Sequence, residues 1–315
     1  MKSLLKRLGR GAIGALSATA LLLGVVATAA PAQAVTRSWS TYFAYGDNCT
    51  LYHSAGNAHY ALCIQRSGGY ARAIAYVQTV GAAKVSVTLR SAAGSYANSW
   101  GCTTLSMVAG QNRTCVGDWY TPTLPTHSAG ASFVINGVAQ SSLGVVTIRN
   151  IWGTPQEKDN WCGPGAMKAS LNAMNTAGSV TQSTLALQSD TDWLGTWPSD
   201  VAHTMNFYVA THKYVSAYED KMTSLNRIAV STRAGRPSLL VVRPQDLPGG
   251  SGGYSRFRHW ISIYGYATRG GMVERMPYFD PANARTGELD LNQFVRAADS
   301  AVPLYPHDYA LVAGR

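Results

Sequence analysis

Short apolar and β-branched segments, separated by Gly, Ser and Asn, follow one another along the first half of the chain. They lie at residues 73–79, 84–90, 132–136 and 144–148. Segments of this length with turn residues between them are typical of β-strands. We therefore predict that residues 35–148 form an all-β, sandwich-like module without a helix of useful length.

The second half of the chain has helical spacing. Met167, Leu171 and Met174 recur at i, i+4 and i+7, as on one face of a helix. Pro164 fits the first turn of this helix, because its missing N–H has no partner there. Further helices are expected at 181–189, from residue 198 and at 222–234, and strands at 214–218, 238–243, 259–266 and 272–279. This order predicts an α+β domain over residues 149–315.

The N-terminal segment has the pattern of an export signal. Four cations, an apolar run over residues 12–30 and the sequence Ala32-Gln33-Ala34 follow one another. We expect residues 1–34 to be a secretory signal peptide, cleaved before Val35. An uncleaved membrane anchor is the alternative. No second long apolar run follows, so we expect a secreted, extracellular protein with no membrane span after cleavage.

The charge of the chain says little about its partners. Removal of Lys2, Lys6, Arg7 and Arg10 lowers the formal net charge from +10 to +6. The remaining cations are scattered, which argues against nucleic acid as a partner. They are compatible with an anionic cell wall. The many aromatic residues of the first half form either a wall-binding face or ordinary sandwich core.

Five cysteines divide unevenly between the two halves. In an oxidising compartment Cys49, Cys63, Cys102 and Cys115 can form two disulfides, with three possible pairings. We prefer Cys49–Cys63 and Cys102–Cys115, because each closes a short loop. Cys162 is then the odd thiol, which is functional, inert or paired with another molecule.

The histidines of the first half form no metal-ligand spacing. We therefore expect His53, His59 and His127 to be surface residues. No metal or other cofactor is expected.

Cys162 lies at the start of the first predicted helix, where unpaired backbone N–H groups and the helix dipole favour a negative charge. A thiol reacts as a thiolate, and the pKa of a cysteine falls at a helix N-terminus beside an imidazole. His259 begins one predicted strand and Asp280 ends the strand that returns from it. Two antiparallel strands can place these side chains together. The alternative bases are His203, His212 and His307.

These segments resemble the papain-like peptidases related to the domain that trims double-glycine leaders from bacteriocins, in particular their secreted, free-standing relatives. The resemblance covers roughly residues 152–280. It rests on Gln156 six positions before Cys162, on Cys-Gly-Pro at a helix start, and on His-Trp followed by Gly-Tyr and Asp-Pro. No transporter segment, which the leader peptidases carry, follows in this chain.

The resemblance implies a role for each residue. Cys162 is the nucleophile, His259 holds the thiolate and protonates the leaving amine, and Asp280 fixes the imidazole tautomer. Gln156 donates to the oxyanion together with the Cys162 backbone N–H, and Asn160 is an alternative donor. No metal is implied.

The expected function is that of a secreted cysteine peptidase that hydrolyses peptide bonds through a thioester acyl-enzyme. Its partner is a peptide or protein substrate, with a cell-wall polymer as a candidate partner of the N-terminal module. The alternatives are a cell-wall peptide amidase, a transglutaminase-like acyl transferase and a catalytically silent secreted binding protein.

Overall fold

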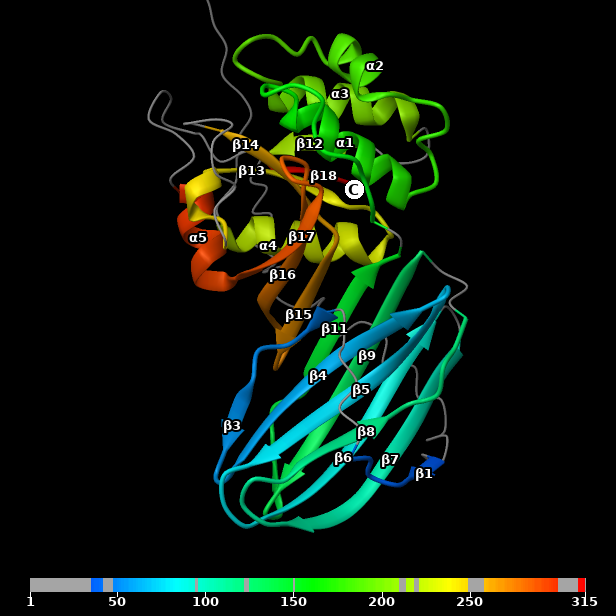
Figure 1. Ribbon diagram of the computed structural model, residues 1–315, viewed down its shortest axis with the longest axis vertical. Helices are drawn as coiled ribbons and strands as arrows, with labels where there is room; N and C mark the ends of the chain where they lie inside the picture. The colour runs from blue at the N-terminus through cyan, green and yellow to red at the C-terminus, as the bar shows by residue number, and fades with distance from the viewer. Residues whose placement is uncertain are drawn as a thin grey trace, which may run out of the picture. The chain divides into compact units, whose positions relative to one another are not determined.

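The computed structural model describes residues 35–41, 48–93, 96–121, 125–149, 151–209, 214–217, 221–248, 258–299 and 311–314 (Figure 1). The expected signal peptide and its cleavage site lie outside these residues, as do His212 and His307. No helix in the described part of the chain is long and apolar enough to cross a membrane.

Residues 35–148 contain strands and no helix wherever the structure describes them. The strands are β1 Val35–Arg37, β2 Asn48–Cys49, β3 His53–Ala55, β4 Ala58–Ser67, β5 Tyr70–Thr79, β6 Ala83–Ala93, β7 Tyr96–Met107, β8 Asn112–Val116, β9 Thr126–Ile135, β10 Val138–Ala139 and β11 Leu143–Ile148. β2, β4, β5 and β8 form a small sheet in that order, with β3 beside β4. The remaining strands of this half belong to a larger sheet.

Both sheets contribute to one core in this half. Leu62 and Ile64 of β4 share a buried cluster with Val85 and Leu89 of β6, whereas Cys63 between them is buried in a separate cluster. Tyr60 and Phe133 come from different sheets, and their ring centroids lie 4.7 Å apart. Alternation with period two assigns residues to the two faces of these strands, but in the middle of β4 and β5 both faces are buried. The sandwich-like description of the module stays a prediction.

The two disulfides are those preferred from loop length. Cys49–Cys63 joins β2 to β4, and Cys102–Cys115 joins β7 to β8 across the two sheets. Cys162 is the remaining cysteine, and it is free and buried.

The expectation that the histidines of this half lie at the surface is wrong for two of them. His53 is 7% exposed and His127 is 3% exposed. His53 Nε2 lies 3.1 Å from a carboxylate oxygen of Glu274, which belongs to the second half of the chain. A carboxylate partner far along the sequence makes burial of an imidazole tolerable, and the local sequence does not reveal such a partner.

The second half is a mixture of helices and strands, as predicted. Its helices are α1 Cys162–Ala173, α2 Gln182–Gln188, α3 Pro198–Tyr208, α4 Lys221–Arg233, η1 Pro244–Asp246 and α5 Leu291–Asp299. Its strands are β12 Tyr214–Ala217, β13 Ser238–Val242, β14 His259–Ile263, β15 Gly265–Arg269, β16 Met272–Asp280, β17 Arg285–Asp290 and β18 Leu311–Gly314.

Helices cover both faces of the central strands of this half. On β13, Leu239 and Val241 share a core with Met167 of α1, whereas Leu240 and Val242 share another with Phe294 of α5. A strand that is buried on both faces has a continuous apolar sequence, which is why residues 238–242 lack alternation. Figure 1 shows α1 and α5 on opposite sides of this part of the sheet.

The larger sheet continues from the first half of the chain into the second. β11 pairs with β15 in antiparallel register from Leu143 with Arg269 to Thr147 with Gly265. The prediction of one strand over residues 259–266 is wrong, because the chain leaves the β14 ladder at Tyr264 and β15 joins β11 instead. Tyr264 itself accepts a hydrogen bond from Ile148 N at 2.7 Å. A domain boundary between residues 148 and 149 stays a prediction.

Candidate active site

Cys162 is the first residue of α1, and only 6% of its surface is exposed. The two glycines that follow allow other segments to approach the helix start. Gly163 lies directly against the Thr196 side chain, and a Cβ on Gly165 would lie 2.7 Å from Cβ of Pro281. The Cys-Gly-Pro-Gly sequence therefore brings the thiol close to the turn that follows Asp280. No such contact could form with larger residues at these positions.

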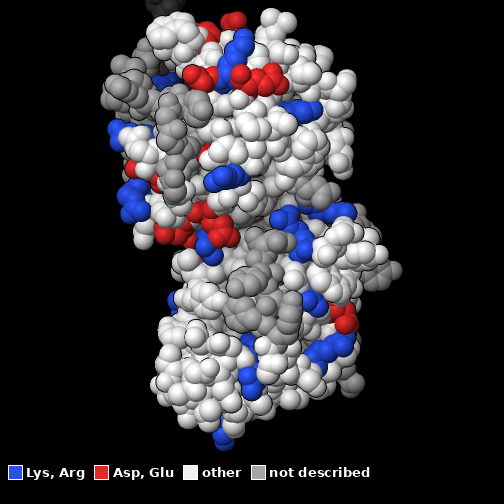
Figure 2. Space-filling view, viewed as in Figure 1, with Lys and Arg blue, Asp and Glu red and all other residues white. Residues whose placement is uncertain are grey.

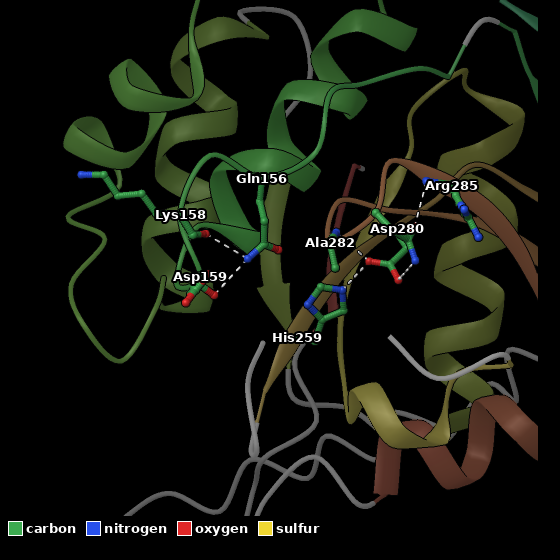
Figure 3. A network of polar contacts seen from close by, with 8 residues as sticks. Gln156, Lys158, Asp159, His259, Asp280, Ala282 and Arg285 are labelled. Atoms are coloured by element: carbon green, nitrogen blue, oxygen red, sulfur yellow. Dashed lines mark hydrogen bonds and ion pairs between the residues drawn. The ribbon is translucent and has the colours of Figure 1, made fainter. Parts of the chain in front are cut away.

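His259 and Asp280 lie next to each other on neighbouring strands. β14 and β16 are antiparallel, with Ser262 opposite Phe279. His259 Nε2 lies 2.6 Å from Asp280 Oδ1, and the two residues are 1% and 5% exposed. Asp280 Oδ1 also accepts a hydrogen bond from Ala282 N at 2.8 Å (Figure 3). The carboxylate is therefore held by its own turn as well as by the imidazole.

The other face of the imidazole meets the thiol. Because Nε2 faces Asp280, Nδ1 is the ring nitrogen left for the hydrogen bond between His259 and Cys162. Burial alone would lower the pKa of His259, but the hydrogen bonds to Asp280 and Cys162, with Coulombic attraction to both, raise it from 6.5 to about 9. The imidazole is therefore protonated at neutral pH, and a negative partner stabilises it there.

Gln156 lies beside the same site, but its amide donors are occupied. Its backbone N donates to Pro281 O at 2.7 Å, which ties the loop to the residue after Asp280. Its side-chain Nε2 donates to Lys158 O and Asp159 O, both at 2.9 Å, while Oε1 is buried without a partner (Figure 3). In this arrangement neither N–H of the amide is available to a substrate unless it leaves one of these carbonyls.

The alternative residues considered from the sequence lie elsewhere or have other partners. Asn160 Nδ2 donates to Asp192 O at 2.5 Å. His203 is exposed on α3, without an imidazole contact to Cys162. Within the described ranges, no cluster of three or more His, Cys, Asp and Glu side chains could hold a metal ion.

Gln182 is a residue near the site that the sequence did not reveal. It is 2% exposed, and its Oε1 accepts from Glu157 N at 3.1 Å. Its Nε2 donates to Pro155 O at 2.9 Å and to Thr154 Oγ1 at 3.1 Å. One buried amide thus holds the backbone on both sides of Gln156. A glutamine directly after the helix cap Thr181 carries no sequence signal that separates it from a solvent-exposed residue.

Comparison with known proteins gives one finding for this region. Residues 148–298 match the Peptidase_C39 like family. A comparison with curated proteins gave no match. The matched range contains the Gln156 loop, the start of α1 and both strands that carry His259 and Asp280. The match supports a papain-like cysteine peptidase domain of the C39 type over residues 148–298.

Proposed function

We propose that this protein is a secreted cysteine peptidase in which Cys162, His259 and Asp280 act as a catalytic triad. One observation carries the proposal: a single buried imidazole contacts both the free thiol and a carboxylate, the latter at 2.6 Å. The family match supports cysteine peptidase activity in general. Export is supported by the pattern of the first 34 residues and is compatible with the two disulfides.

The reaction begins with the thiolate of Cys162 and the imidazolium of His259. The thiolate attacks the peptide carbonyl carbon, and the resulting oxyanion accepts a hydrogen bond from the Cys162 backbone N–H in the first turn of α1. His259 then gives its proton to the leaving amine, which departs and leaves a thioester. Neutral His259 next takes a proton from water, the hydroxide attacks the thioester, and the acid and thiolate are released.

Asp280 keeps the imidazole in the orientation and tautomer that these steps need, because Nε2–H points at its carboxylate and Nδ1 points at the thiol. Gln156 serves as a second oxyanion donor only after one N–H of its amide leaves the carbonyl of Lys158 or Asp159. Substrate binding would drive this exchange of hydrogen bonds. Loss of one such donor typically costs about 100- to 1,000-fold in turnover.

The proposal is tested by digestion of an unfolded protein mixture with protein that begins at Val35. New N-termini are identified by mass spectrometry, and Cys162→Ala serves as the control. We expect the variant to produce none of the new N-termini, whereas cleavage that persists in it would contradict the proposal. Glycinamide added to the digestion distinguishes hydrolysis from acyl transfer, since a transferase would attach it to the new C-termini.

A further inference from the structure

A hollow of about 280 Å³ lies outside the peptidase site, where three segments of the first half meet. The turn between β4 and β5 supplies residues 66–70, β9 supplies His127, and the residue after β11 supplies Arg149. Figure 2 shows basic and acidic side chains beside one another in several places on the face in view. Arg66 and Arg149 are far apart in the sequence, but both line this hollow, and no acidic residue is among its described lining residues.

The backbone around the hollow is fixed by regular hydrogen bonding. Arg66 pairs with Ala71 across the β4–β5 hairpin, and His127 pairs with Thr147 between β9 and β11. Arg149 N donates to Pro125 O at 2.9 Å. The cationic residues therefore project from a rigid frame, which reduces the entropic cost of binding a ligand between them.

The charge of the hollow is positive. None of the described residues that line it is acidic. Burial, together with the positive charges of Arg66 and Arg149, lowers the pKa of His127 to about 4. The imidazole is therefore neutral at pH 7 and experiences the field of both guanidinium groups. A bound anion would reduce this field, and guanidinium groups bind carboxylate and phosphate oxygens in pairs of parallel hydrogen bonds.

A buried polar atom without a partner gives a second, independent observation. His127 is 3% exposed and its Nδ1 has no hydrogen-bond partner. The edge of the Tyr120 ring packs near it, with centroids 6.2 Å apart, and the buried Tyr120 hydroxyl is also unpartnered. Buried polar groups are nearly always hydrogen-bonded, so this unpartnered imidazole nitrogen beside two arginines indicates a missing partner, which an anion supplies when the nitrogen carries the proton.

We propose that this hollow binds a small oxyanion, the carboxylate or phosphate group of a ligand, between Arg66, Arg149 and His127. Each guanidinium donates to the anion, and the neutral imidazole donates through a ring N–H. No residue of the Cys162 site lines the hollow, so this proposal does not depend on the peptidase activity.

The test is an NMR titration of the histidine ring signals of the purified protein with sodium phosphate or sodium acetate. Sodium chloride at the same ionic strength is the reference, and exposed His203 is the internal control. We expect a saturable shift of the His127 signals with phosphate, acetate or both, and a pKa of His127 at least one unit higher when the anion is bound. The anion that saturates at the lower concentration identifies the preferred group. No saturable shift with either anion, or the same shift with chloride, would overturn the proposal.

Charge-matched variants test the same site independently. Arg66→Gln and Arg149→Gln each remove a donor, whereas Arg90→Gln removes the same charge at an exposed position outside the hollow. A hydrogen bond to a charged group typically corresponds to roughly 10-fold or more in affinity. We therefore expect weaker anion binding by that factor in the first two variants and unchanged binding in the third. Equal affinity in all three variants and the parent protein would also overturn the proposal.

Discussion

Replacement of Asp280 by Asn isolates the effect of one negative charge on the imidazole of His259. The substitution keeps an oxygen at the position of Oδ1, which accepts from His259 Nε2 at 2.6 Å and from Ala282 N at 2.8 Å. It places an NH₂ group where Oδ2 stands, 3.5 Å from Asn283 Nδ2. The oxygen of that neighbouring amide accepts from Arg285 N at 3.0 Å, so a turn of the amide toward residue 280 exchanges one hydrogen bond for another. The position of residue 280 beside His259 should therefore be kept, while the negative charge of the carboxylate is lost.

The size of the effect follows from the pKa of His259. A rise from 6.5 to about 9 corresponds to on the order of 3 kcal/mol in favour of the imidazolium. Asp280 and Cys162 share this stabilisation, so loss of the carboxylate charge should lower the pKa by about one to two units. In the parent protein this contribution to stability is complete below pH 6.5 and is lost as the pH rises through 9. In Asp280→Asn the contribution of His259 to stability should be smaller, and it should be lost at a lower pH.

Histidine-ring NMR across pH measures the pKa directly, and urea unfolding at pH 6 and pH 9.5 measures the associated stability. Asp190→Asn is a suitable control, because Asp190 is exposed and its φ of +46° is one that Asn tolerates. We expect this control to titrate like the parent protein. A pKa of His259 near 6.5 in the parent, or the same pKa in parent and Asp280→Asn, would refute the reasoning.

Three further expectations concern contacts that stabilise the fold. Gln182→Ala should remove three partly buried hydrogen bonds to the Gln156 loop. We expect the free energy of unfolding in urea to fall by about 1–3 kcal/mol and kcat to fall more than KM rises; an unchanged kcat would show that the loop keeps its position without Gln182. Replacement of Cys49 and Cys63 by serine removes a disulfide with a sequence separation of 14. We expect this double variant to have a free energy of unfolding about 3 kcal/mol lower than that of the parent, and equal urea midpoints would contradict this. A fragment that starts at residue 141 keeps β11 against β15 and should unfold at higher urea than one that starts at residue 149; equal midpoints would show that β11 does not support this edge.

Local features of the second half could be predicted because each depends on a few neighbouring residues. Pro164 marks the start of α1, and the Thr181 side chain accepts from Thr184 N at 3.1 Å at the start of α2. The preference for a helix at residues 222–234 likewise agrees with α4, Lys221–Arg233. In the first half, the two disulfides could be predicted in the same way, because each closes a short loop.

Features that depend on contacts between distant segments could not be predicted in this way. The apolar pattern of residues 259–266 is continuous, and only the arrival of β11 beside β15 explains why the chain divides at Tyr264. Gln182 and His53 are polar residues whose burial depends on partners elsewhere in the chain. The occupied amide of Gln156 is a similar case, since the sequence indicates a donor near Cys162 but not which carbonyls that donor meets first.

The central claim is that Cys162 is a nucleophile that His259 activates in the folded protein. Its most direct test is iodoacetamide labelling of the protein across pH, with the modified residue located by mass spectrometry and with Cys162→Ser and His259→Ala as comparisons. An ion pair predicts selective labelling of Cys162 near pH 5, loss of that labelling in His259→Ala, and recovery only at alkaline pH. Labelling that begins only above about pH 8 in the parent protein would be that of an ordinary thiol and would contradict the claim.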